Sequence, residues 1–251
     1  MEHVSVDKEL VVVCEWFRNN KMILKPEKGK ALVLSKKPNL KLSLFSGGVA
    51  LPVLDAVDLF ELTLDNSLNF GKHITKISKK VGKQLDVLCR LKNIFSFWTK
   101  VSLYNSFIMS HFHYCSSIWH NCFTSDGKTL DRLHKRALRY LYSDESSQTS
   151  SPCDSIGYSL EDRRIQNLLI IVCKSINNYP PEYLRDLFRL RDNIKNLRGV
   201  NKLQVPKPNM TRYVKNSVRF LAATTWNKIS DTLRSLTILS AFRKAVRELR
   251  F

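Results

Sequence analysis

Residues 67–142 constrain the fold of this chain more than any other stretch, because they contain amphipathic segments with helical spacing. Apolar residues that recur at steps of three and four lie on one face of an α-helix. The first such stripe consists of Ile74, Ile77, Val81, Leu85, Leu88 and Leu91. A second stripe consists of Leu130, Leu133, Ala137, Leu138 and Leu141. Together with the segment between them, these stripes predict three helices that each bury one face in a core.

The faces opposite the two stripes are basic. Residues 71–142 contain 13 Lys+Arg and only 3 Asp+Glu. A charged helix face is usually just solvated, but two such helices with so little acid between them favour a surface that binds a polyanion. The predicted phosphate ligands are Lys72, Lys76, Lys79, Lys80, Lys83, Arg132, Lys135, Arg136 and Arg139.

The net charge of +19 is unevenly distributed along the 251 residues. Residues 71–142 carry a net +10 and residues 185–251 a net +12, while residues 143–184 are slightly acidic. Hydrophobic residues make up 43% of the chain, which is enough for a folded core. Basic blocks of this kind most often neutralise phosphates, and they predict binding that weakens steeply with salt.

The cysteines and the hydropathy pattern indicate the compartment. The six cysteines form no C-x-x-C pair, so neither a disulfide framework nor a standard zinc spacing is visible. No apolar run approaches the roughly 18 residues that span a bilayer, and the start of the chain has no secretory h-region. We therefore expect free thiols and an intracellular protein, in the nucleus or cytoplasm, without a membrane partner.

Composition divides the chain into four segments. Residues 1–66 contain a predicted helix and then short runs of strand-forming residues, separated by proline and glycine, which indicate two hairpins. Residues 67–142 are the basic helical segment. Residues 143–159 are rich in serine and predict a linker, and residues 160–251 form a basic helical tail. The predicted fold class is mainly α with a small antiparallel β element near the N-terminus, or α+β.

Three further helices can be outlined from sequence patterns. In the helix expected over residues 5–20, the inward residues are Leu10, Val13, Cys14 and Phe17. Ser159 followed by Asp162 is typical of a capping box at a helix start. The last predicted helix begins near Ser240, and we expect it to pack on the helix that contains Trp226.

Several motifs occur in the order found in one family of polymerases. The run W-x-x-x-N-x-M-x-L-x-P-x-K-x-K at 16–30 is similar to the stretch after the catalytic Asp-Asp of reverse transcriptases from non-LTR retrotransposons, of the jockey and chicken-repeat (LINE) kind. L-x-L-D-x-x-L-x-F-x-x-H-I at 62–74 resembles the primer-grip hairpin that runs into the thumb. F-x-Y-C-x-x-x-W at 112–119 and L-x-x-L-x-x-R-A-L-R at 130–139 resemble thumb and post-thumb helices, and 163–184 resembles the tail.

This resemblance implies a truncated polymerase palm followed by a helical thumb. Residues 1–66 would be the remnant of the palm with its primer-grip-like hairpin, and the implied partners are an RNA or RNA–DNA duplex and the missing N-terminal part of the polymerase. The chain departs from the family at Lys25, where the family has Asn, and at Phe60 and Glu61, where it has Leu-Gly. A glycine there permits a close backbone approach or a φ that Cβ disfavours.

The catalytic carboxylates of the family are missing. Phosphoryl transfer needs two metal ions held by converging carboxylates, and this chain contains no Asp-Asp pair. Asp55, Asp58 and Asp65 are interpreted as turn and edge residues. The resemblance places Lys28 near the leaving pyrophosphate, where an ammonium neutralises the departing oxygen, but a solvated loop lysine is an equal interpretation. We expect no polymerase activity and no cofactor in this chain alone, with Mg²⁺ only in an intact polymerase.

One cluster of histidines and cysteines invites a comparison with zinc sites. Its members are His111, His113, Cys115, His120 and Cys122. If the segment is helical, side chains two residues apart point about 200° away from each other and cannot share one ion. We therefore predict no metal site. The expected alternative is the packing of nearby aromatic residues, namely Phe112, Tyr114, Trp119 and Phe123.

The sequence thus predicts a C-terminal fragment of a retrotransposon RNA-directed DNA polymerase. Its role would be to bind the backbone of an RNA or RNA–DNA template-primer without reading bases. The alternatives are a stand-alone basic helical nucleic-acid-binding module and a non-functional relic. A relic would expose apolar strands and aggregate, whereas a stand-alone module would be soluble by itself.

Overall fold

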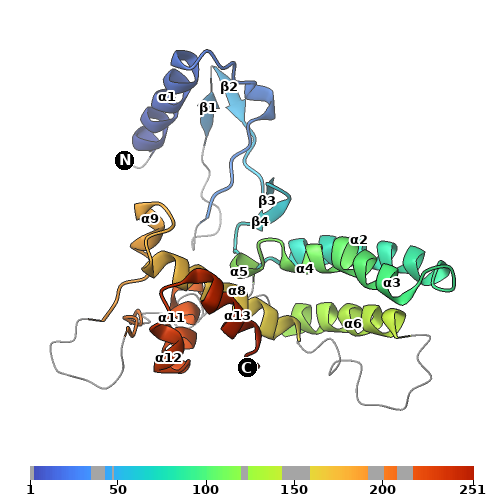
Figure 1. The fold of residues 1–251 in the computed structure, drawn as a ribbon. Coiled ribbons are helices and arrows are strands. Elements are labelled where there is room, and N and C mark those ends of the chain that lie inside the picture. The colour runs from blue at the N-terminus through green and yellow to red at the C-terminus, as the bar shows by residue number, and fades with distance from the viewer. Residues whose placement is uncertain are drawn as a thin grey trace. The chain divides into compact units, whose positions relative to one another are not determined.

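The computed structural model describes residues 3–34, 43–46, 48–119, 124–142, 159–191, 201–207 and 217–251 (Figure 1). Most of the predicted linker, 143–159, lies outside these residues. The chain is mainly helical with two small antiparallel sheets, as the α+β prediction required. It forms two compact units, 1–76 and 77–251, and the division falls within helix α2 (Gly71–Arg90).

The first unit contains one long helix and two hairpins. Its elements are α1 (His3–Asn19), the 3-10 turn η1 (Pro26–Lys28), β1 (Leu44–Ser46), β2 (Val49–Leu51), β3 (Ala56–Leu59) and β4 (Leu62–Asp65). In the first hairpin Leu44 pairs with Leu51, and in the second Ala56 pairs with Asp65. The two predicted hairpins are confirmed, but they form two separate sheets.

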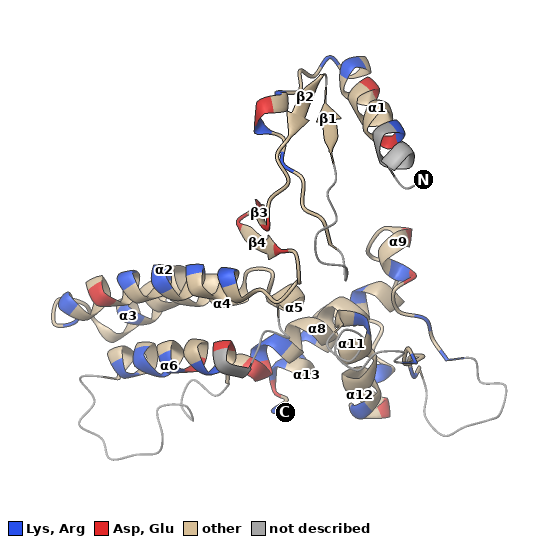
Figure 2. Ribbon diagram, turned by 180° about the vertical axis from the view of Figure 1, so that it is seen from behind, with Lys and Arg blue, Asp and Glu red and all other residues tan. Residues whose placement is uncertain are grey.

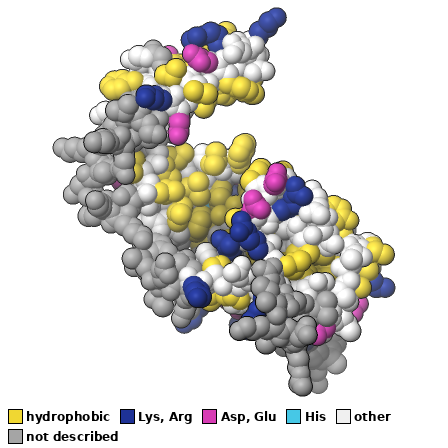
Figure 3. Space-filling view, turned by 90° about the vertical axis from the view of Figure 1, so that its left-hand side faces the viewer, with side chains coloured by type: hydrophobic (Ala, Val, Ile, Leu, Met, Phe, Trp, Pro, Cys, Tyr) yellow, Lys and Arg dark blue, Asp and Glu magenta, His cyan; other side chains and the backbone are white. Residues whose placement is uncertain are grey.

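Helix α1 leaves much of its apolar side exposed. It packs on β1, where Cys14 Sγ lies 3.8 Å from Ser46 Oγ. Cys14 and Phe17 are half-buried, but the prediction that Val13 faces inward is wrong, because this side chain is 47% exposed. Figure 3, which looks at the side of the molecule that carries α1, shows hydrophobic side chains along this helix. One short hairpin is too narrow to cover the whole stripe.

The loop of the second hairpin has an unusual backbone. Its two central residues, Phe60 and Glu61, have φ values of +48° and +64°. Positive φ at both positions is the signature of a tight two-residue hairpin turn, in which glycine or asparagine is normally preferred. Position 61 therefore has a backbone conformation that favours glycine, and Glu61 adopts it in spite of its Cβ.

The connection from β4 to α2 is organised by the buried carboxylate of Asp65. Asp65 Oδ1 accepts hydrogen bonds from the backbone N–H groups of Ser67 and Asn69, at 3.0 and 3.1 Å. Asp65 Oδ2 accepts a third from the N–H of Phe70, at 2.9 Å. Leu68 and Phe70 both have positive φ in this turn. The carboxylate satisfies the backbone donors that this tight path would otherwise leave without partners.

Replacement of Asp65 by alanine is expected to destabilise the first unit by roughly 2–3 kcal/mol, because three backbone donors lose a charged acceptor. Native-state hydrogen exchange at Ser67, Asn69 and Phe70 measures this loss directly. Asp55→Ala is the matched control, because the Asp55 side chain is exposed. Equal exchange rates in the two variants would contradict the role given to Asp65.

The first half of the second unit is a set of helices around the predicted apolar stripes. After α2 come α3 (Phe97–Leu103), the π turn η2 (Tyr104–Met109), α4 (Ser110–His113), α5 (Ser116–Trp119) and α6 (Thr124–Leu141). The two predicted apolar stripes are confirmed in large part. Their buried residues are Ile74, Ile77, Val81, Leu85, Leu88, Leu130, Ala137, Leu138 and Leu141. Leu91 follows the end of α2 and is 37% exposed, so its inward assignment is wrong.

The second half is built on α8 (Leu160–Ile176). Ser159 caps it through the predicted capping box with Asp162, which is confirmed. Helix α8 packs against α5, α11 (Val218–Lys228) and α13 (Leu239–Arg247), while α9 (Glu182–Arg185) and α12 (Asp231–Arg234) are short turns beside them. The core contains Leu168, Leu169, Val172, Cys173, Phe188, Leu203, Ala222, Ala223, Trp226, Ile229, Phe242 and Val246.

Contacts at Trp226 confirm the predicted packing of the last helix. The ring of Trp226 lies 5.5 Å from that of Phe242 on α13. Trp226 Nε1 donates to the carbonyl of Asn201, and the side chain of Asn227 bonds both backbone groups of Leu203. Residues 201–207 are thus attached to α11 through Asn201 and Leu203. No described helix combines the length and apolar composition needed to cross a lipid bilayer.

Candidate nucleic-acid interface

The basic side chains of α2 and α6 lie opposite the buried stripes of these helices. All nine predicted phosphate ligands are exposed. Figure 2 shows lysine and arginine recurring along both helices. In α2, Val81 and Leu85 are fully buried while Lys79 and Lys83 face solvent. In α6, Leu130 and Ala137 are fully buried and Arg132 and Arg139 are exposed, so each helix has one apolar and one cationic face.

Two of the nine residues belong to the first unit, and one of these is already paired. Lys76 Nζ lies 3.0 Å from Asp58 Oδ2 and 3.7 Å from Glu61 Oε2. The hydrogen bond to Asp58 raises the pKa of Lys76. Hydrogen bonds from Thr63 and then from Lys76 lower the pKa of Asp58. Lys76 is therefore bound to acidic residues of the second hairpin, and it is a weaker phosphate ligand than the sequence suggested. Lys72 is exposed as well.

An ion pair joins the two basic faces within the second unit. Arg136 Nη2 of α6 lies 2.5 Å from Asp86 Oδ1 of α2. Side chains three or four residues apart are neighbours on a helix surface. Lys83 and Arg90 therefore flank Asp86 on α2, while Arg132 and Arg139 flank Arg136 on α6. Basic residues of both helices therefore surround the Arg136–Asp86 ion pair.

The α2–α6 face, as we call this surface, consists of Lys79, Lys80, Lys83, Arg90, Arg132, Lys135, Arg136 and Arg139. Except for Arg136, none of these side chains forms an ion pair with the described residues. Arg90 was missed by the sequence interpretation, although its position four residues after Asp86 could have indicated it. Long exposed cations without acidic partners are suited to the oxygen atoms of phosphates.

The structure describes part of the histidine and cysteine cluster that resembles a zinc site in sequence. His111 and His113 lie on α4, Cys115 lies in the turn after it with φ of +48°, and His120 and Cys122 lie outside the described residues. No three His, Cys, Asp or Glu side chains in the described ranges are grouped so that they could hold a metal ion.

The aromatic packing expected in that segment is confirmed only for two rings. Phe112 and Trp119 are each 1% exposed, and Trp119 Nε1 donates to the carbonyl of Tyr114. Tyr114 is 46% exposed, and the backbone leaves the helix at this residue, with ψ of 121°. Phe123 lies outside the described residues.

Histidine contributes no positive charge to the α2–α6 face at neutral pH. Burial, and then the positive charge of Lys80, lowers the pKa of His111. Burial, and then the charge of Arg163, lowers the pKa of His113. Both shifts favour the neutral imidazole, so lysine and arginine alone determine the charge of this surface.

Three other residues singled out from the sequence, Lys28, Asp58 and Asp65, lie in the first unit. Lys28 is exposed at the end of η1. The glycine after it, Gly29, lies so close to β2 that a Cβ would be 2.5 Å from Leu51 Cδ2. Asp58 is paired with Lys76 and Asp65 accepts three backbone donors, so neither carboxylate is available to a metal ion.

Comparisons of the chain with known proteins gave no match. No family model matches it, and no curated protein or solved structure was found to match it. Its function is therefore inferred from the exposure, charge and packing of the described residues, and the α2–α6 face is the candidate site.

Proposed function

We propose that this chain binds the phosphate backbone of RNA or of an RNA–DNA duplex through the α2–α6 face. It is the C-terminal part of an RNA-directed DNA polymerase of the non-LTR retrotransposon kind, with the α2–α6 segment in the place of the thumb. The observation that carries this proposal is the Arg136–Asp86 ion pair, because it joins two cationic helix faces into one surface.

The chemistry of the surface favours backbone binding over base recognition. Lysine and arginine that project from a helix face neutralise phosphates and release counterions, which supplies affinity without sequence preference. The deep, narrow major groove of an A-form duplex excludes side chains from its base edges, so such duplexes are recognised through shape and backbone. The α2–α6 face has the cations for this role and exposes no aromatic platform between them that would stack on bases.

The chain does not perform the polymerase reaction by itself. The Mg²⁺ ions of an intact polymerase need converging carboxylates, and no three His, Cys, Asp or Glu side chains of the described residues are grouped to hold a metal ion. These ions would be bound by the missing part of the polymerase. The contribution of this chain is to hold and position the duplex.

Exposed apolar side chains favour the fragment over a stand-alone module. In the first unit, Val11, Trp16, Phe45 and Leu59 are each more than half exposed. A soluble domain rarely leaves so many large apolar residues exposed without a partner. The palm strands of the polymerase would cover these side chains. A stand-alone module has no element that would cover them.

The salt dependence of binding tests the α2–α6 face. In a variant with Lys79, Lys80, Arg136 and Arg139 replaced by alanine, the slope of log affinity against log salt should flatten by roughly 3–4 units, at about 0.9 per lost phosphate contact. Fluorescence anisotropy with a labelled RNA–DNA duplex at several salt concentrations measures the slope.

A second variant with the same loss of charge controls for net charge. Arg18, Lys21, Arg219 and Lys228 are exposed basic residues outside the α2–α6 face, and their replacement by alanine should change the slope by less than one unit. Circular dichroism verifies that both variants are folded. If the two slopes were the same, the α2–α6 face would not be the binding surface.

A further inference from the structure

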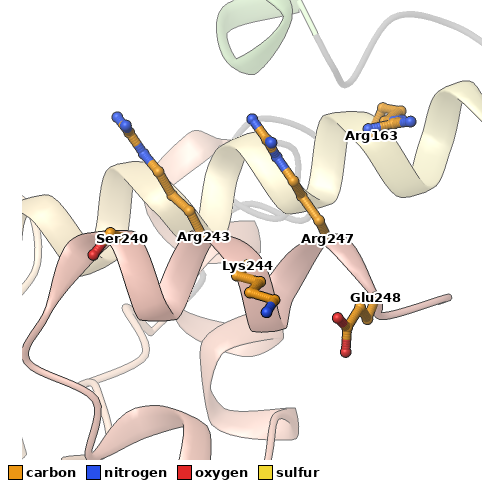
Figure 4. A pocket seen from close by; sticks show the side chains of 6 residues that line it. All are labelled: Arg163, Ser240, Arg243, Lys244, Arg247 and Glu248. Atoms are coloured by element: carbon orange, nitrogen blue, oxygen red, sulfur yellow. The ribbon is translucent and has the colours of Figure 1, made fainter.

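A second cationic site lies between α8 and α13. A pocket of about 600 Å³ is lined by Arg163 of α8 and by Ser240, Arg243, Lys244, Arg247 and Glu248 at the end of the chain. Figure 4 shows Arg243 and Arg247 extending side by side from α13 in the same direction, with Arg163 further along α8, and Lys244 and Glu248 pointing away from the two arginines.

Packing and hydrogen bonds hold α13 in one orientation on α8. Phe242 and Val246 are fully buried in the core. Gln166 Nε2 of α8 donates to the carbonyl oxygens of Arg247 and Leu249, at 3.4 and 3.0 Å. The backbone N–H of Phe251 donates to Asp162 Oδ1 at 2.9 Å. The hydrogen bonds fix the C-terminal end of α13, and the two buried side chains fix which of its faces meets the core, so Arg243 and Arg247 have a set position.

The charges of this site are poorly balanced. Arg243 and Arg247 are one helical turn apart and are exposed, and like charges at this spacing repel each other. Among the described residues neither forms an ion pair, and Glu248 is the only acid that lines the pocket. At the N-terminus of α13, Ile238 provides no side-chain cap, so the first N–H groups beside Ser240 add positive potential.

We propose that Arg243 and Arg247, supported by Arg163 and Ser240, form a binding site for two successive phosphate groups. A guanidinium binds phosphate oxygens in a bidentate manner, and the spacing of one helical turn, about 5–6 Å between Cβ atoms, matches two phosphates joined in one chain. This site shares no residue with the α2–α6 face. Its ligand is either the backbone of a nucleic acid strand or a free polyphosphate.

Two probes distinguish the sources. Isothermal titration calorimetry measures sodium tripolyphosphate, and fluorescence anisotropy measures a labelled single-stranded oligonucleotide, each with the full chain. Arg243→Gln with Arg247→Gln should weaken the binding of at least one probe tenfold or more. A loss for tripolyphosphate alone assigns the site to a free polyphosphate, and a loss for the oligonucleotide assigns it to a nucleic acid backbone.

The control removes the same charge from the neighbouring helix. Arg219→Gln with Lys228→Gln on α11 should leave both affinities within twofold, because both side chains are exposed away from the pocket residues. The double Arg→Lys variant at positions 243 and 247 should retain part of the affinity, which shows that the charge acts at the site. Absence of binding by the wild-type chain to either probe, or an equal loss in the α11 control, would overturn the proposal. The tripolyphosphate result does not depend on the α2–α6 face, whose variant should bind tripolyphosphate normally. The oligonucleotide is measured in that variant, so that the α2–α6 face does not contribute to its binding.

Discussion

Replacement of Arg234 by methionine is expected to destabilise the second unit by about 2–4 kcal/mol, because several backbone carbonyl oxygens lose a charged hydrogen-bond donor. The side chain of Arg234 is 4% exposed. Its Nη1 donates to the carbonyl oxygens of Trp226 and Asn227, at 3.3 and 3.1 Å, and to that of Ile229. Its Nη2 donates to the carboxylate of Asp231.

The guanidinium of Arg234 thus completes the C-terminal end of α11. The last carbonyl groups of a helix have no partner within the helix, and a cation at this end also interacts favourably with the helix dipole. Burial lowers the pKa of Arg234, but arginine remains charged at any ordinary pH. Methionine would fill the space without donating hydrogen bonds, so three buried carbonyl oxygens would be left without a partner.

Urea unfolding followed by tryptophan fluorescence measures this effect, because Trp119 and Trp226 are both buried in the second unit. Arg219→Met is the matched control, since Arg219 is an exposed arginine on the same helix, and its effect should be below about 0.5 kcal/mol. A difference between the two variants of less than about 1 kcal/mol would mean that the Arg234 network contributes little.

Acid is expected to destabilise the second unit through the buried side chain of His134. Burial, and then the positive charges of His113, Arg163 and Arg164, lowers the pKa of His134 to about 4. His134 is 6% exposed on the inner face of α6. Its Nε2 shares a hydrogen bond of 2.8 Å with the hydroxyl of Tyr104, and its ring lies edge-on to Phe112.

The direction of the pH effect follows from the two pKa values. In the unfolded chain the imidazole has its ordinary pKa of 6.5, so it binds a proton as the pH falls through this value. In the folded chain it stays neutral until about pH 4. The unfolded state binds more protons between these limits, so the stabilisation is complete above pH 6.5 and is lost progressively toward pH 4. The loss amounts to about 3 kcal/mol for this group.

The measurement is the free energy of unfolding in urea at several pH values between 7 and 4. His134→Gln should remove most of the slope, because glutamine keeps a polar group beside Tyr104 but does not titrate. His113→Gln should have a smaller effect, because His113 is more accessible to solvent than His134. Parallel pH curves for the wild-type chain and the His134 variant would show that the acid sensitivity arises elsewhere.

Much of the secondary structure could be predicted because it depends on local spacing. The stripes of α2 and α6, the capping box at Ser159 and the contact between Trp226 and α13 follow from residues close together in the chain or from long apolar faces. The wrong assignments at Val13 and Leu91 share one cause. A period identifies the face of a helix, but it does not tell how much of that face another element covers or where the helix ends.

The candidate sites depended more strongly on the tertiary structure. The sequence by itself determined which side chains of α2 and α6 are exposed, because a residue on the side of a helix opposite its buried stripe faces solvent. Only the tertiary structure decided that Lys76 is engaged by Asp58, that Arg136 meets Asp86 across two helices, and that Arg243 and Arg247 lie beside Arg163. These pairings join residues far apart in the chain, and only the packing of the buried cores determines which exposed faces become neighbours.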